Sequence, residues 1–281
     1  THPTEGKVAS GGDDGILRIW DVEGKTHVQA MQQPHPIRCV TFHPEGNKIA
    51  IGFKSGSARD GVPVRVVDVS SEEWALEMHA SDAMHCVSCL KWSPAGAQQL
   101  LAAASWDQKV YVYDMAGEVP LEGRLLYQLT GNTAAIEHIL FSADGDILMS
   151  NSKDAQMLYW EVETGARITK TSSLRDVQWS QWTAVLGWQV MGIWDAEYDL
   201  TDVNMVCQSH GKEGKPGDVI ALADDYGMTK LLRFPCPVPF AATAAQYRGH
   251  TSHVTNVRFL HDDSFLLSAG GGDTGIFQWS V

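Results

Sequence analysis

The chain has 281 residues, of which 44% are hydrophobic and 20% are charged, a balance that excludes a disordered or collagen-like chain. Its 34 acidic and 21 basic side chains give a formal net charge of −13, which argues against binding to the phosphate backbone of nucleic acids. The longest nearly apolar stretch is residues 183–194, whereas a membrane-spanning helix needs about 20 residues. We therefore predict neither a nucleic acid nor a membrane as partner.

A repeat of about 47 residues organises the sequence from its N-terminus. Each copy contains a strand-like run that closes on an aromatic or apolar side chain, often followed by an acidic one. The closing residues in chain order are Trp20, Val67, Tyr113, Trp160, Trp194, Leu232 and Trp279. The first four of them are separated by 47, 46 and 47 residues, which predicts a repeated structural unit.

An aspartate precedes the closing residue in five copies. It lies six residues upstream in four of them and seven residues upstream in the other. The five aspartates are Asp14, Asp107, Asp154, Asp273 and, at the longer distance, Asp225. Because an aspartate in a turn accepts hydrogen bonds from nearby backbone N–H groups, we predict that all five stabilise the turn before a strand.

Further turns and strands complete each repeat. A polar turn that ends in glycine follows an apolar run at Gly46, Gly96 and Gly145. Residues 124–130 have the pattern of a fourth strand, and no amphipathic helix of ten residues is visible. Four-stranded units every 40–50 residues or so are typical of WD40-type β-propellers. We predict an all-β propeller of about seven four-stranded blades, forming a single domain over residues 1–281. In this type of protein the turn aspartate also binds a histidine, which His250 supplies for Asp273.

Both ends and two inner segments depart from the repeat. Residues 1–6 resemble the turn after a first strand, and the chain ends on a third strand, so we expect incomplete first and last blades in a fragment of a longer protein. Residues 54–63 are an insertion. The fifth blade is short, with strands expected at 176–179, 182–188 and 190–194 and an acidic connector at 195–202. Its tryptophans Trp179, Trp188 and Trp194 alternate with apolar residues and are expected in the core.

The five cysteines are too few and too scattered for a disulfide framework and suit a reducing compartment. Cys86-Val-Ser-Cys89 has the spacing of a zinc or redox motif. The segment reads as a strand, however, and strand positions three apart point to opposite faces. Two separate thiols are therefore favoured over a metal or redox site.

Binding is favoured over catalysis. The sequence has no G-x-S-x-G or H-E-x-x-H motif, and Gly270-Gly-Gly-Asp273 lacks the rest of a phosphate-binding loop. We predict no catalytic residue, no cofactor and no bound metal. An enzyme remains the least favoured hypothesis.

Six side chains are predicted to bind a partner. In WD-type propellers, the loops before first strands and the turns before third strands share one face, and exposed aromatic and arginine side chains are common interface anchors. Trp106 and Tyr226 lie in turns before third strands. The other four lie near the starts of first strands: His35, His85, Arg175 and His253. The alternative for Trp106 is packing against the neighbouring blade.

Several motifs are similar to the echinoderm microtubule-associated protein-like (EMAP-like) family. They include Asp176-Val-Gln-Trp179, Val185-Leu-Gly-Trp188, Ala223-Asp-Asp-Tyr-Gly227, Phe234-Pro-Cys236 and His250-Thr-Ser-His253. The resemblance covers the whole chain and is strongest over residues 137–281, whereas residues 55–63 and 211–217 differ from the family pattern. The family has two tandem propellers, and this chain resembles the second. It implies a non-catalytic scaffold in the cytoplasm that binds αβ-tubulin or another cytoskeletal protein on microtubules, in a flagellum or in a cilium. Microtubule attachment and oligomerisation in the family lie in an N-terminal region outside this chain.

A second hypothesis stays open beside this one. The chain is then a WD-repeat adaptor of another class, such as a flagellar scaffold or substrate receptor, that reads a short peptide on the same face. If the partner is tubulin, which is itself acidic, contact requires a local neutral or basic patch on this acidic chain.

Overall fold

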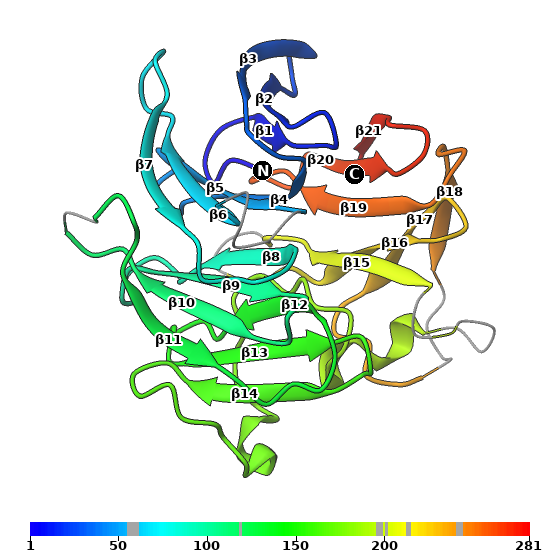
Figure 1. The fold of residues 1–281 in the computed structure, drawn as a ribbon. Coiled ribbons are helices and arrows are strands. Elements are labelled where there is room, and N and C mark those ends of the chain that lie inside the picture. Colours follow the sequence, from blue (N-terminus) through cyan, green and yellow to red (C-terminus); the bar gives the residue numbers. More distant parts are fainter. Residues whose placement is uncertain (55–61, 118–119, 195–198, 200–201, 212–214, 240–243) are drawn as a thin grey trace. The chain divides into compact units, whose positions relative to one another are not determined.

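The computed structural model describes residues 1–54, 62–117, 120–194, 199, 202–211, 215–239 and 244–281 (Figure 1). The chain has two compact units, Thr1–Ser180 and Gln181–Val281. Most of the predicted insertion (55–61) and most of the predicted acidic connector (195–198 and 200–201) lie outside the described residues. Within the described residues, no helix is long and apolar enough to cross a membrane.

The first unit contains four antiparallel sheets (Figure 1). Their strands are β1 (Lys7–Ser10), β2 (Ile16–Asp21) and β3 (Thr26–Gln32); β4 (Ile37–Phe42), β5 (Lys48–Phe53), β6 (Val64–Asp68) and β7 (Ala75–Ala80); β8 (Val87–Trp92), β9 (Leu100–Ser105), β10 (Val110–Asp114) and β11 (Leu125–Leu129); and β12 (Ile136–Phe141), β13 (Ile147–Ser152) and β14 (Met157–Glu161). Each sheet is built from consecutive strands in chain order, because short turns return the chain beside the strand it has just left.

The second unit contains two sheets of the same design. Their strands are β15 (Val203–Gln208), β16 (Val219–Asp224), β17 (Met228–Arg233) and β18 (Ala245–Arg248), followed by β19 (Val254–Phe259), β20 (Phe265–Gly270) and β21 (Ile276–Ser280). The first sheet of the chain and the last both have three strands, in agreement with the prediction that these blades are incomplete.

The core of the first unit lies between neighbouring sheets. Strand β9 is buried along its whole length, and its sequence Leu-Leu-Ala-Ala-Ala-Ser places small side chains where two sheets approach it from both faces. Ala103 and Tyr111 of this sheet pack in one cluster with Val66 and Met78 of the preceding sheet. The outermost strands are more exposed, as the pattern of β3 shows. Apolar contact between sheets therefore fixes the positions of the turns that carry the site.

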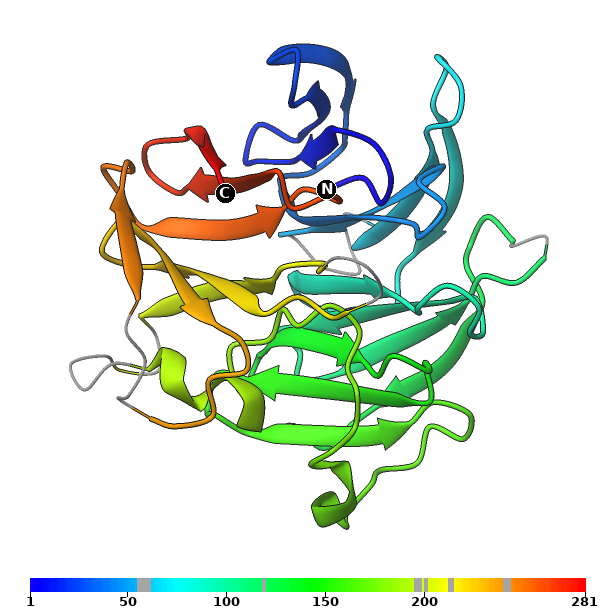
Figure 2. The same ribbon diagram turned by 180° about the vertical axis from the view of Figure 1, so that it is seen from behind.

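The fifth repeat does not form a sheet, so the described residues form six sheets where about seven blades were predicted. Two 3₁₀ helices, η1 (Thr171–Leu174) and η2 (Trp188–Ile193), flank an irregular segment (Figure 2). The strands predicted at 182–188 and 190–194 are absent. Residues 176–179 contribute a single isolated bridge, from Trp179 to Ser142.

A contact within the segment and another with a distant residue explain this departure. The indole of Trp182 is 1% exposed, and a Cβ at Gly187 would lie 2.2 Å from it, so the chain folds closely over this ring. The amide of Gly192 donates to the carbonyl of Cys236 at 2.6 Å, which replaces strand pairing. The core prediction for Trp188 was wrong, because its side chain is 50% exposed at the start of η2.

Candidate functional site

The turns before the third strands share one backbone geometry. The residue after the predicted aspartate has a positive φ in four sheets: Gly15, Gln108, Ala155 and Thr274. This left-handed residue bends the chain back so that the aspartate carboxylate meets donors of its own turn. Asp14 accepts the amide of Ile16 at 3.0 Å, while Asp154 accepts the hydroxyls of Ser152 and Thr133, both at 2.5 Å.

Asp107 joins its turn to the preceding loop and to a buried tyrosine. Its Oδ1 accepts the amide of Lys109 at 3.2 Å, and its Oδ2 accepts the amide of Met84 at 2.7 Å and the hydroxyl of Tyr111 at 2.8 Å. Burial, with a further contribution from Asp107, raises the pKa of Tyr111 well above its usual range, so the phenol stays protonated and donates.

Replacing Asp107 with alanine is expected to lower the free energy of unfolding by about 1–3 kcal/mol, because it leaves the amide of Met84 and the hydroxyl of Tyr111 without their acceptor. The measurement is urea unfolding followed by circular dichroism. Asp14→Ala is the matched control, since its turn is exposed, and should cost about 0.5 kcal/mol or less. Equal losses in the two variants would contradict the special role of Asp107.

In the fifth aspartate turn the prediction named the wrong residue. Asp224, whose side chain is fully buried at the end of β16, accepts the amides of Tyr226 and Met228 at 3.0 and 2.8 Å. Asp225 instead accepts the side-chain amide of Asn204 at 2.7 Å. The sequence offers two adjacent aspartates, and the register of β16 selects the one that faces inward.

Tyr226 occupies the position that aspartate holds in the other turns, because it precedes the positive-φ residue Gly227. Its side chain is 57% exposed. The carboxylate of Asp202 raises the pKa of Tyr226. Tyr226 therefore presents a protonated phenol in acidic surroundings.

A four-residue network lies behind the last aspartate turn. His250 Nδ1 is 2.9 Å from Asp273 Oδ2, and His250 Nε2 is 2.8 Å from Ser268 Oγ. The indole N–H of Trp279 donates to the same serine oxygen at 2.8 Å. Because a carboxylate can only accept, the Nδ1 of His250 donates its proton to Asp273.

Trp106 lies among charged side chains contributed by two other sheets of the first unit, β4–β7 and β12–β14. Lys153 Nζ is 4.2 Å and Arg38 Cζ is 5.9 Å from the centre of the Trp106 ring, distances at which cations are attracted to the face of an indole. Glu137 pairs with both cations, at 3.1 Å to Lys153 and 3.8 Å to Arg38. We call Arg38, Trp106, Glu137 and Lys153 the Trp106 cluster.

The other predicted binding residues lie in different surroundings. The exposed ring of His85 is 5.8 Å from that of Trp106, so the structure brings these two together. His35 is half-buried, with its ring 6.0 Å from that of Phe53. Arg175 was expected at the start of a first strand but follows η1, because the fifth repeat has no sheet. In the second unit, His253 is exposed and contacts Ser252, with 3.0 Å between its Nδ1 and the serine Oγ.

Sequence reasoning missed Arg38, Glu137 and Lys153. A signal for Lys153 was present, since it precedes Asp154 as Trp106 precedes Asp107, one repeat of 47 residues earlier. The backbone confirms that the positions correspond. Trp106 N donates to Cys86 O and Lys153 N to Ala135 O, both at 2.9 Å.

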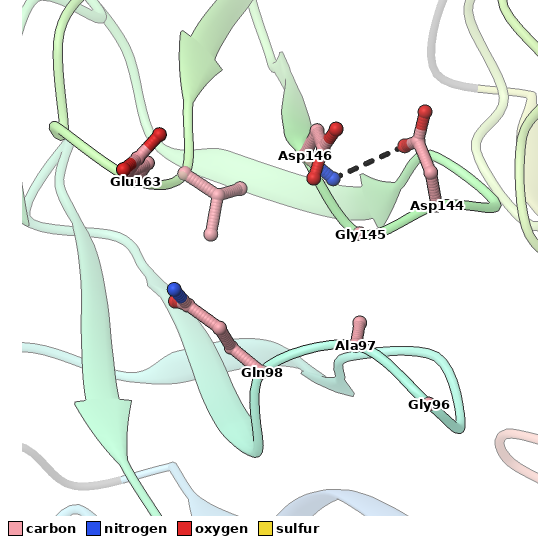
Figure 3. Close-up of a pocket in the computed structure, with 8 residues that line it drawn as sticks. Gly96, Ala97, Gln98, Asp144, Gly145, Asp146 and Glu163 are labelled. Atoms are coloured by element: carbon pink, nitrogen blue, oxygen red, sulfur yellow. Dashed lines mark hydrogen bonds between the residues drawn. The ribbon is translucent and has the colours of Figure 1, made fainter.

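A pocket of 260 Å³ lies at the other end of these sheets, between the β8–β9 and β12–β13 turns (Figure 3). It is lined by Gly96, Ala97, Gln98, Asp144, Gly145, Asp146, Val162 and Glu163. The Asp144 carboxylate accepts the amide of Asp146 at 3.1 Å. The pocket contains none of the predicted binding residues.

The cysteines are all free thiols. Burial raises the pKa of Cys86 to about 11, so it stays protonated at neutral pH. In the part of the chain that the structure describes, no three histidine, cysteine or acidic side chains converge as metal ligands.

Comparison with known proteins identifies relatives along the whole chain. The family model for the second β-propeller of echinoderm microtubule-associated protein matches residues 1–281. Echinoderm microtubule-associated protein-like 3 of Mus musculus is 35% identical over 282 residues, covering 100% of this chain and 30% of that protein. Echinoderm microtubule-associated protein-like 2 of Rattus norvegicus is 36% identical over 284 residues, and the 77 kDa echinoderm microtubule-associated protein of Lytechinus variegatus is 34% identical over 280. The chain spans 41% and 40% of these two proteins, so it corresponds to well under half of each relative.

A solved structure supports the fold. A chain in the crystal structure of the mitotic checkpoint complex superposes with a TM-score of 0.70 at 16% identity, covering 98% of this chain and 84% of that one. Together with the family model, this likeness confirms the predicted WD40-type β-propeller.

Proposed function

Since the chain belongs to the echinoderm microtubule-associated protein-like family, as its second β-propeller, we propose that it is a non-catalytic protein-interaction scaffold of a microtubule-associated protein. The observation that carries the proposal is the Trp106 cluster, where an indole and two cations from three sheets meet. Such aromatic and arginine side chains are enriched at the anchoring points of protein interfaces. In this proposal residues 1–281 act as one domain without a cofactor.

The proposed partner is αβ-tubulin or another cytoskeletal protein, and the proposed location is the cytoplasmic cytoskeleton at microtubules, including those of a flagellum or cilium. Relatives whose names describe microtubule-associated proteins support this choice. Trp106 and His85 are the proposed contact residues in the first unit, with His35 and Arg175 as further candidates. Tyr226 and His253 are proposed for the second unit, where both are exposed. Oligomerisation is assigned to regions outside this chain.

We expect the purified protein to co-elute with αβ-tubulin in size-exclusion chromatography at tens of micromolar. Trp106→Ala should weaken this association about 30-fold, the loss typical when a central interface tryptophan is truncated. Tyr226→Ala tests the second unit separately, and Val28→Ala is the control for loss of an exposed apolar side chain on β3.

The circular dichroism spectrum and melting temperature of each variant show whether it is folded. Co-elution that Trp106→Ala abolishes in a folded protein supports tubulin binding at the proposed residues. If the wild-type protein shows no shift with tubulin, the tubulin proposal fails, and the adaptor that reads another peptide becomes the better hypothesis.

A further inference from the structure

The first unit places two lysines and a tryptophan at equivalent turn positions of three successive sheets. Lys54, Trp106 and Lys153 each follow an inner strand, and each donates its backbone N–H to the carbonyl of a residue before the preceding strand. The corresponding residues of the second unit are Asp225 and Gly271, which make the same backbone hydrogen bond. In a chain of net charge −13, lysine occurs at this turn position in two sheets of the first unit, on either side of the sheet that carries Trp106.

The cations of the Trp106 cluster are more exposed than the carboxylate that pairs with them. The side chains of Arg38 and Lys153 are 38% and 52% exposed, whereas that of Glu137 is 22% exposed. Glu137 thus pairs with the two cations from a less exposed position, while their side chains stay partly open to solvent. An arginine has five N–H donors and a lysine three, more than one carboxylate can satisfy.

The indole of Trp106 has a feature that a purely space-filling role does not explain. Its Nε1 is buried and has no hydrogen-bond partner within the described residues. A purely apolar side chain would pack here without a buried donor, whose burial is unfavourable when it is unpaired. The ring also holds the two cations near each other, at 4.2 and 5.9 Å from its centre.

We propose that the Trp106 cluster binds an acidic, extended segment of the partner protein, with carboxylates on Arg38 and Lys153 and the peptide packed on the indole. The inference rests on the proposed function and adds the chemistry of the ligand. Alternate side chains of an extended peptide are about 7 Å apart, so two carboxylates of one short segment are close enough to contact both cations around one ring. Arg38 provides the planar pair of donors that suits a carboxylate. A local cationic site also explains how an acidic chain can associate with an acidic partner.

The test is fluorescence anisotropy with a labelled peptide of five Glu-Gly pairs, at about 50 mM salt, where exposed ion pairs are screened less than at physiological salt. A peptide of five Gln-Gly pairs is the uncharged control. The double variant Arg38→Gln/Lys153→Gln should bind the acidic peptide about tenfold or more weakly than the wild type. The matched control is Lys7→Gln/Arg124→Gln, which removes the same charge from two cations of similar exposure that also pair with carboxylates. It should change the affinity about twofold or less.

Glu137→Gln supplies a change in the opposite direction. It frees both cations from their internal carboxylate, so the acidic peptide should bind about threefold or more tightly. A merely structural role of this ion-pair network would not increase affinity. Melting temperatures show whether all variants remain folded.

Selective binding of the acidic peptide, weaker in Arg38→Gln/Lys153→Gln and tighter in Glu137→Gln, supports the inference. Equal binding of the Glu and Gln peptides, no binding of either, or equal losses in the two double variants would overturn it. The same variants are tested for co-elution with αβ-tubulin. If tubulin binds the wild type and the Arg38→Gln/Lys153→Gln variant equally, the proposed function stands and the acidic-segment site is rejected. Peptide binding without tubulin binding supports the site and rejects tubulin as its partner.

Discussion

Replacing Trp182 with alanine is expected to lower the free energy of unfolding by about 3–5 kcal/mol, the usual loss for a buried tryptophan. The ring is 1% exposed and contacts Gly187, and its ring centre lies 6.3 Å from that of Phe234. Its indole N–H donates to the carbonyl of Ala184 at 2.7 Å, so the substitution removes a hydrogen bond as well as apolar contacts. Urea unfolding followed by far-ultraviolet circular dichroism gives the free energy without relying on tryptophan fluorescence.

Trp188 provides the matched control, because it is the same residue type in the same irregular segment but is 50% exposed. Trp188→Ala should cost about 1 kcal/mol or less. Losses of similar size in the two variants would mean that the segment is not organised around Trp182.

The second large effect is expected for Asp273→Ala, which should lower the free energy of unfolding by about 2–4 kcal/mol. The carboxylate accepts from the buried ring of His250 and from the amides of Thr251 and Gly275. Its removal leaves the Nδ1 proton of His250 without an acceptor, although Ser268 still holds the other ring nitrogen. The loss is measured by the same unfolding experiment.

A double-mutant cycle shows whether the network acts as a unit. Asp273→Ala/His250→Ala should cost much less than the two single losses added together, because the second substitution removes a group that the first has already left unpaired. Asp262→Ala in the β19–β20 turn is the control, since this exposed carboxylate accepts the amide and the hydroxyl of the nearby Ser264. It should cost about 0.5 kcal/mol or less. Additive losses at Asp273 and His250 would refute a cooperative network.

The repeat made most of the fold predictable. The runs ending at Trp20, Tyr113, Trp160 and Trp279 all form strands, because β-branched and aromatic residues at regular spacing suit the inner and outer faces of stacked sheets. The fifth repeat was predictable only in part. Its apolar alternation imitates strands, but the chain at Gly187 packs on Trp182 and Gly192 bonds to Cys236. The alternation within the segment does not indicate these contacts.

The candidate site was predictable at Trp106 but not in its surroundings. An aromatic residue in a turn that does not require one is visible in the sequence. Arg38 lies 68 positions before it and Glu137 31 positions after it, so their approach depends on how sheets pack. The Asp224-Asp225 pair shows the same limit on a smaller scale, since the choice between adjacent aspartates follows from strand register.

The order of strands within the sheets has a consequence for synthesis of the chain. Every sheet consists of consecutive strands, so its backbone hydrogen bonds join residues that are near each other in sequence. Such local pairing carries a small entropic cost of loop closure and permits early formation. A sheet such as β4–β7 has all its strands available as soon as Ala80 has left the ribosome, before any residue of the next sheet is needed. The nascent chain can therefore pair its strand edges one sheet at a time, which shortens the period in which they are open to other chains.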